Sequence, residues 1–399
     1  MIKRQKLEIR NQKIKRNRLL ILYFIFLFLI SHFSFLSPYS FAAEPKPLKI
    51  GVISPETGDE AETGLMTLAG VELAAKQFND AGGIEGKNIE IIHYDNKSNP
   101  QLTQGVFQQL IKEHVIAIIS SPTGWSTFGP VWLANAAKVI LLSAGSKRHI
   151  GRSGPFIFRN GLPDEIGTEE TIKYAMEKLK YKNYAIVTSM RDDETSLQIG
   201  GLFRGAIIKK GGTIVSETHV MMGATMEEAI SQLKKDAKET IDAVIFAGDD
   251  TAAVDVLREL RKQNIKAPLI GGDILYTDAF LKNGGELVVG SILYAGFFPE
   301  DKSPIVSKFV SEYQKETGKK PGIVSANAYD SFMLIAEAIR QAKSTDPVIV
   351  KELLAKINMQ GATGKITMDT EGETIKQPYI LRVARRGGKA VFELVGGEH

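Results

Sequence analysis

Two halves of this 399-residue chain repeat one order of strands and helices, and this repeat constrains the fold more than any other feature. Short apolar runs separated by amphipathic stretches indicate buried parallel strands joined by helices. The first predicted helix of each half ends at a Gly-Gly pair, Gly82-Gly83 or Gly211-Gly212, as helix C-termini often do. Each half thus holds four strands and three helices, which predicts two open α/β lobes. The predicted strands are 48–53, 88–94, 115–119 and 139–142, then 184–188, 213–217, 242–247 and 267–270.

The rest of the chain does not make a third lobe. It reads as a strand (287–295), three helices (305–317, 324–342 and 347–356) and a hairpin (378–385 and 389–395). We expect these pieces to complete the two sheets, so that the chain crosses between lobes more than once and forms a hinge with a cleft. The predicted lobes are 48–162 with 296–365, and 163–295 with 366–399. The fold class is therefore two doubly wound open α/β lobes joined by a multi-crossover hinge.

The N-terminus reads as a targeting segment. Residues 1–18 carry eight Lys or Arg and one acid, Glu8, and the apolar run 19–30 follows. With Ser40-Phe41-Ala42 as a small-x-small cleavage site, this order predicts a signal peptide over residues 1–42 and a periplasmic mature protein. An uncleaved membrane anchor is the alternative, because the basic region is long and aromatic residues continue to Phe41.

Charge and composition exclude several function classes. Removing residues 1–42 takes away eight basic residues and one acid, so the formal net charge changes from +4 to about −3 and no nucleic-acid partner is expected. The chain has no cysteine, and its six His are scattered without the spacing of zinc sites. We expect no metal, no cofactor and no disulfide framework.

Two stretches superficially resemble motifs of enzymes, but neither matches the motif at the positions that it requires. The stretch 82–87 resembles a phosphate loop, but Ala81 stands at its first Gly position and a strand follows it where a helix is required. The stretch 124–128 fails as a nucleophile elbow, because Phe128 replaces the closing Gly and no base is marked nearby. We therefore expect a binding protein and not an enzyme.

Polar loops at strand ends are the candidate site. The loops after strands 115–119 and 139–142 leave the carboxyl ends of neighbouring parallel strands, the edge where ligands bind in open α/β sheets. Their hydroxyls and backbone N–H groups suit recognition of a small polar molecule, although Ser, Thr and Gly also serve simply as turn formers. Across the predicted cleft, Asp249, Asp250 and Asp273 follow second-lobe strands, and their alternative role is helix N-capping.

The ordered motifs resemble a known family over nearly all of residues 48–395. They are Ile50-Gly51-Val52 with Pro55-x-Thr57-Gly58, Asn79-x-Ala81-Gly82-Gly83-Ile84-x-Gly86, Tyr94-Asp95, Ser143-Ala144-Gly145-Ser146, Ala328-Tyr329-Asp330 and Gly364-Lys365-Ile366. The set resembles the type I periplasmic binding proteins of ABC transporters, specifically the branched-chain amino-acid-binding (leucine/isoleucine/valine) family. The resemblance implies two lobes with three crossovers that close over a ligand and deliver it to an inner-membrane ABC permease.

The resemblance also implies site residues, each carried over by position. The ligand carboxylate would be held by 123–126 and 144–147, where Lys147 replaces the family's Thr, and the ammonium by Asp273. Aromatic wall positions fall at Thr63, near Thr195 and at Asp249 or Asp250, so we expect a ligand more polar than leucine. The candidate residues are Ser121, Thr123, Gly124, Trp125, Ser126, Ala144, Gly145, Ser146, Lys147, Thr195, Asp249, Asp250 and Asp273.

The expected function is therefore an exported, monomeric solute-binding protein of an ABC importer that binds an amino acid or a related polar solute. The alternative is a periplasmic ligand sensor or regulatory subunit with the same fold. Cleft residues alone do not separate the two, because both functions use the same cleft.

Overall fold

The computed structural model describes residues 2–33, 46–190, 194–221 and 223–396. The chain divides into two units, residues 1–46 and 47–399. The first unit contains one helix, α1 (Ile2–Phe33), and within the described residues no helix has the length and apolar character needed to cross a membrane. The expected cleavage site at residues 40–42 lies outside the described residues.

The second unit contains two α/β lobes, and the first is built on a five-stranded parallel sheet of order β2-β1-β3-β4-β5. Its strands are β1 (Leu48–Ile53), β2 (Ile89–Tyr94), β3 (Ala117–Ser120), β4 (Ile140–Ser143) and β5 (Ile157–Arg159). One apolar cluster covers one face of the sheet with α2 (Ala61–Asp80), α11 (Pro304–Thr317), α12 (Ile323–Ala342) and α13 (Pro347–Leu354). Another cluster joins the sheet to α3 (Pro100–Lys112) and α5 (Val131–Ala137). The first lobe is thus doubly wound, as predicted.

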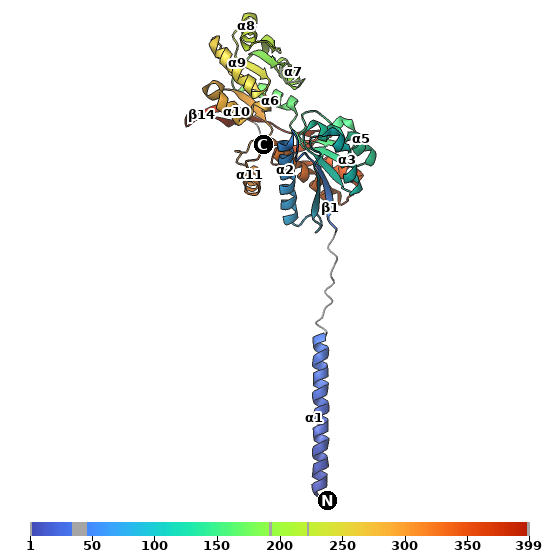
Figure 1. Cartoon of the computed structure of the whole chain (residues 1–399). Helices are drawn as coiled ribbons and strands as arrows, with labels where there is room; N and C mark the ends of the chain where they lie inside the picture. Colours follow the sequence, from blue (N-terminus) through green and yellow to red (C-terminus); the bar gives the residue numbers. More distant parts are fainter. Residues whose placement is uncertain (1, 34–45, 191–193, 222, 397–399) are drawn as a thin grey trace. The chain divides into compact units, whose positions relative to one another are not determined.

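The second lobe is built on a seven-stranded sheet of order β15-β14-β10-β9-β8-β6-β7. Its strands are β6 (Asn183–Ser189), β7 (Thr213–Val220), β8 (Ala243–Ala247), β9 (Leu269–Gly271), β10 (Ile292–Ala295), β14 (Tyr379–Arg386) and β15 (Lys389–Gly396). Helices α6 (Asp164–Glu177) and α7 (Glu194–Lys209) contribute to one core, and α8 (Met226–Asp236), α9 (Asp250–Lys262) and α10 (Asp278–Gly284) to the other (Figure 1). The predicted C-terminal hairpin is confirmed, because β14 pairs antiparallel with both β10 and β15.

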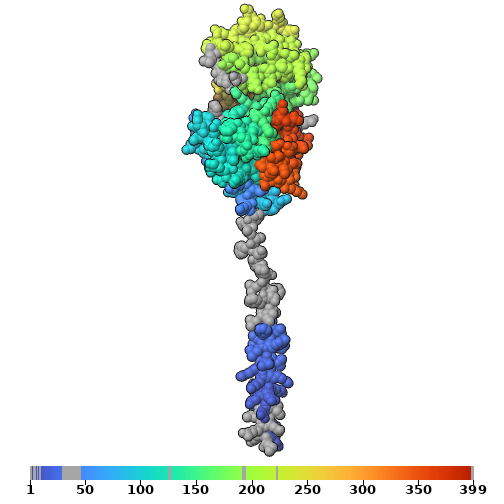
Figure 2. All heavy atoms as spheres, turned by 90° about the vertical axis from the view of Figure 1, so that its right-hand side faces the viewer, coloured from blue at the N-terminus to red at the C-terminus, as the bar shows by residue number. Residues whose placement is uncertain are grey.

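The chain crosses between the lobes three times: between β5 and α6, between β10 and α11, and between β13 and β14. A small third sheet, with β11 (Asn358–Gly361), β12 (Gly364–Met368) and β13 (Thr374–Ile375), precedes the last crossing. Ile366 packs in the first-lobe core, and Glu373 forms a β-bridge with Arg159. Residues 366–375 therefore pack with the first lobe, whereas the sequence boundary had assigned them to the second. Figure 2 shows the orange-red atoms of this part of the chain beside the teal first-lobe atoms.

Several local predictions need correction. The sequence pattern predicts a loop over residues 120–127 and one helix over about 128–137. The structure instead has two short helices, α4 (Gly124–Phe128) and α5, on either side of Pro130, which lacks the N–H that a continuous helix requires. Part of the expected loop 120–127 is thus helical. The expected strand 287–295 begins as a 3₁₀ helix, η3 (Gly285–Val288), and only its end is β10. Helices α6 and α10 and strand β5 were not predicted.

Candidate functional site

Two cavities meet where the loops of the two lobes face each other. The second-lobe cavity has a volume of about 280 Å³, and the first-lobe cavity has a volume of about 240 Å³. Lys147 and Asp273 line both of them. We therefore treat the two cavities as parts of one cleft, divided by this pair of side chains. A larger hollow of about 830 Å³, lined by residues of α6 and of the small sheet, contains none of the predicted site residues.

The dividing pair is an ion pair between the lobes. Lys147 follows β4 of the first lobe, and Asp273 follows β9 of the second, where it begins the 3₁₀ helix η2 (Asp273–Leu275). The Lys147 Nζ lies 2.5 Å from Asp273 Oδ2 and 3.7 Å from Asp164 Oδ1. The Lys147 side chain is 53% exposed and that of Asp273 is 26% exposed, so solvent screens this contact in part.

Electrostatics favour the charged form of Lys147. Desolvation opposes ionisation, but the carboxylates of Asp273 and Asp164 raise the pKa of Lys147 above its usual value. Burial raises the pKa of Asp164, and this effect outweighs the Lys147 charge and the hydroxyl of Tyr294, which donates to Asp164 Oδ1 at 2.9 Å. Asp164 is also the first residue of α6, where the helix dipole favours a negative charge.

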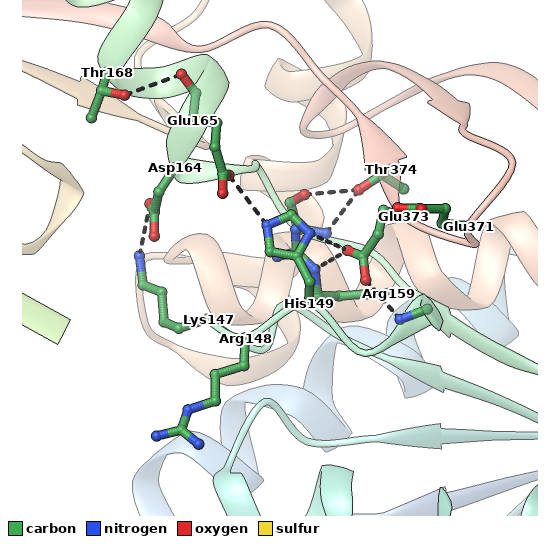
Figure 3. Close-up of polar contacts among 12 residues, drawn as sticks. Lys147, Arg148, His149, Arg159, Asp164, Glu165, Thr168, Glu371, Glu373 and Thr374 are labelled. Atoms are coloured by element: carbon green, nitrogen blue, oxygen red, sulfur yellow. Dashed lines mark hydrogen bonds and ion pairs between the residues drawn. The ribbon is translucent and has the colours of Figure 1, made fainter. Parts of the chain in front are cut away.

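A second charged cluster lies beside the first (Figure 3). Arg159 and Glu373 form an ion pair in which both side chains are nearly inaccessible, at 2% and 3% exposure. The Arg159 Nη1 donates to the carbonyl of Ser146 at 2.8 Å. His149 lies between Glu165 of α6, 3.2 Å from its Nε2, and Glu373, 3.4 Å from its Nδ1. The β4–β5 loop thus reaches the second lobe at both Lys147 and His149.

This cluster gives a pH-dependent prediction. Hydrogen bonds to Glu165 and Glu373 raise the pKa of His149 from 6.5 to about 9. Because the folded-state pKa is raised, the stabilisation by His149 is complete below about pH 6.5 and is lost as the pH rises through about 9. We expect the melting temperature of the wild type to fall more steeply between pH 7 and pH 10 than that of His149→Gln, measured by calorimetry. Parallel pH profiles for the two proteins would contradict this assignment.

The predicted hydroxyl cluster is placed differently from the expectation. Ser121, Thr123 and Ser126 are buried and line neither cavity. Thr123 Oγ1 donates to Ser126 Oγ at 2.6 Å, and Asn96 Nδ2 donates to the same oxygen at 2.8 Å. These contacts tie the β3 loop to the segment after β2. In this structure the hydroxyls of Thr123 and Ser126 therefore hold the loop together, and neither residue lines either cavity.

The other predicted residues divide between the cavities and the helix ends. Those that line a cavity are Ala144, Gly145, Ser146, Lys147, Thr195, Asp249 and Asp273. Asp249 is also the N-cap of α9, accepting the Ala252 N–H at 2.7 Å, so its alternative role is realised. Asp250 accepts a hydrogen bond from Thr277 at 2.6 Å and lines neither cavity. Gly124 begins α4 and lines neither cavity, and the side chain of Trp125 lies outside what the structure describes.

Sequence reasoning missed the acid, the guanidinium and the apolar walls of the cleft. Arg159 lies within residues 156–163, a segment that the sequence pattern predicts to be only a connection, and Asp164 directly follows it. Ile199, Phe246 and Tyr294 give the second-lobe cavity apolar walls. Of the wall positions expected to be polar, Thr195 and Asp249 line this cavity but Thr63 and Asp250 do not. The cleft thus combines a charged end with an apolar body. An Arg directly after an apolar run was the available signal for the buried cation.

Among the described residues, no group of three or more His, Cys, Asp or Glu side chains could hold a metal ion. What the arrangement offers is charged and polar groups around two adjacent cavities that share Lys147 and Asp273. This chemistry suits binding of a small solute.

Comparisons with known proteins agree with this interpretation. Residues 47–389 match the family model described as periplasmic binding protein. A curated relative, the amino acid binding protein of Pseudomonas aeruginosa, is 26% identical over 343 residues, which are 83% of this chain and 88% of the relative.

Two solved structures show the same two-lobed fold. One is the branched-chain amino acid transporter substrate binding protein LivJ from Streptococcus pneumoniae, in complex with isoleucine, which has a TM-score of 0.67 and 26% identity. The match covers 88% of this chain and 99% of the LivJ chain. A solute binding protein of an ABC transporter from Rhodopseudomonas palustris, in complex with 3,4-dihydroxybenzoic acid, has a TM-score of 0.69 and 22% identity. The match covers 87% of this chain and 96% of the chain in that structure. The similar proteins are thus binding proteins.

Proposed function

The chain belongs to the periplasmic-binding-protein family, and on this premise we propose that it is the non-enzymatic solute-binding protein of an ABC importer. Its ligand is a small carboxylate-bearing solute, an amino acid or a related compound, held between the two lobes. The observation that carries the proposal is the Lys147–Asp273 contact between the lobes, with a cavity on each side of it.

The chemistry of the cleft supports a carboxylate. The first-lobe cavity offers the Lys147 ammonium, the Arg159 guanidinium and the backbone at Gly145, which has a φ of +107°. Charged donors and oriented N–H groups bind carboxylates strongly. Similar proteins bind isoleucine and 3,4-dihydroxybenzoic acid, two solutes that share a carboxyl group. The apolar walls of the second-lobe cavity would cover the body of such a molecule.

The partners and location follow from the same proposal. The protein works in the periplasm as a monomer and delivers its solute to an inner-membrane ABC permease. Export removes residues 1–42. A sensor that uses the same cleft is the competing function, and a pull-down from membranes distinguishes the two, because a transport protein would capture a permease.

One experiment tests export and binding together. The full chain is expressed, and the periplasmic fraction is purified without denaturation and weighed by mass spectrometry under native and denaturing conditions. We expect the denaturing mass to lack the first 42 or 43 residues and the native mass to include a small acid. A full-length, membrane-pelleting species would contradict export. A native mass without an adduct, together with no thermal stabilisation by any carboxylate solute, would contradict solute binding.

A further inference from the structure

The protein's own ammonium occupies the place where the ammonium of an amino acid would be expected. The sequence assigned Asp273 to the cation of the ligand, yet Lys147 Nζ lies 2.5 Å from Asp273 Oδ2 in the structure. Building on the proposed function, we infer that Lys147 permanently supplies the counter-charge of Asp273, and that the ligand is a carboxylic acid without an α-ammonium group.

The other acids of the cleft are also engaged. Besides Asp273, the acids that line the two cavities are Asp164 and Asp249. Asp164 accepts the Tyr294 hydroxyl at 2.9 Å and lies 3.7 Å from Lys147. Asp249 accepts the Ala252 N–H as the N-cap of α9. A ligand ammonium would therefore enter beside Lys147, a like charge, with every lining acid already in use. The cleft disfavours a zwitterion.

The first-lobe cavity, in contrast, is lined by a residue with an unsatisfied hydrogen-bond donor. Arg159 lines this cavity, is 2% exposed, and its Nη2 has no hydrogen-bond partner among the described residues. A buried guanidinium N–H without an acceptor is costly, and a ligand carboxylate would satisfy it. Two glycines keep the surroundings open, because a Cβ at Gly161 would lie 3.0 Å from Arg159 Nη1, and one at Gly145 would lie 2.6 Å from Asn327 Nδ2. We thus place the carboxylate of the ligand at Arg159 in the first-lobe cavity. The apolar body of the ligand then lies in the second-lobe cavity, on the other side of the Lys147–Asp273 pair.

Matched ligand pairs test this inference. Each pair shares a carboxylate and a side chain and differs in the α-ammonium: leucine and 4-methylpentanoate, phenylalanine and 3-phenylpropanoate, glutamate and glutarate. Calorimetry on the wild type is expected to show that, in the pair that binds, the acid without the ammonium binds at least about tenfold more tightly. Lys147→Met removes the ammonium at similar chain length and frees Asp273. In this variant the preference should shift toward the amino acid by about tenfold or more.

The matched control is Lys282→Met on α10, an exposed lysine away from both cavities, which should leave the ratio of the two affinities unchanged. A wild type that prefers the amino acid, or a Lys147→Met ratio equal to the wild-type ratio, would overturn the inference and leave solute binding intact. Binding of none of these compounds, together with a native mass without an adduct and no thermal stabilisation by any carboxylate solute, would overturn the inference together with the proposed function. Melting temperatures of both variants show that folding is retained.

Discussion

Glu373→Gln is expected to lower the free energy of unfolding by about 3–5 kcal/mol, because it leaves a buried guanidinium without its counter-charge. Arg159 and Glu373 are 2% and 3% exposed, so water cannot replace the lost carboxylate. Glu373 Oε1 also accepts the Gly151 N–H at 2.7 Å. Although burial opposes ionisation, the hydrogen bond from His149 and the charge of Arg159 lower the pKa of Glu373 to about 2, so the carboxylate is ionised at neutral pH. Urea unfolding at pH 7 measures the change.

The control is Glu371→Gln, two residues away in the same segment. Its partner is Arg152, and the two side chains are 42% and 74% exposed. An exposed ion pair of this kind contributes about 0–1 kcal/mol, so this variant should unfold almost as the wild type does. Equal destabilisation by the two substitutions would show that the buried Arg159–Glu373 pair stabilises the fold no more than an exposed ion pair does.

Thr195→Trp is expected to weaken solute binding by about 10–100-fold, because overfilling a packed site costs about 1–3 kcal/mol. Thr195 lies in the first turn of α7 and lines the second-lobe cavity, whose volume is about 280 Å³. An indole ring there would occupy the space that we assign to the body of the solute. Calorimetry with the compound that co-purifies with the wild type measures the loss.

Leu197→Trp is the matched control on the same helix. Leu197 is 43% exposed and does not line the cavity, so an added ring there should project into solvent and leave affinity unchanged. If Thr195→Trp binds as tightly as Leu197→Trp, the solute does not occupy the second-lobe cavity. Melting temperatures separate lost binding from lost folding.

The architecture could be predicted from the sequence because its central strands are continuous apolar runs. Strand β1 has the predicted bounds, Leu48–Ile53, and β3 and β4 are parallel neighbours, as expected. Helix α6 was missed because it buries small and polar residues, such as Gly167, Thr168 and Thr171, which leave a weak hydrophobic period. Strand β5 was missed because it is three residues long and ends in Arg159. Residues of these two elements, Arg159 and Asp164, carry the unpredicted charges of the cleft.

The meeting of the strand-end loops could be predicted from the sequence, but the contacts between their side chains could not. Lys147 and Asp273 follow strands of different lobes and line both interlobe cavities, as the position of these loops predicts. Sequence spacing does not show that two side chains 126 residues apart bond to each other instead of to a ligand. It also does not show that Asn96 engages Ser126, because such a contact depends on the packing of loops after different strands. The residue types in these loops indicated polar recognition, but the partner that each side chain contacts is visible only in the folded structure.

The most direct test of the central claim is a crystal structure of the protein with its solute bound. We expect electron density for one small acid between the lobes, with its carboxylate near Arg159, its body against Ile199 and Phe246, and the Lys147–Asp273 pair intact. Density for the solute in the hollow between α6 and the small sheet, with the interlobe cavities empty, would contradict the account.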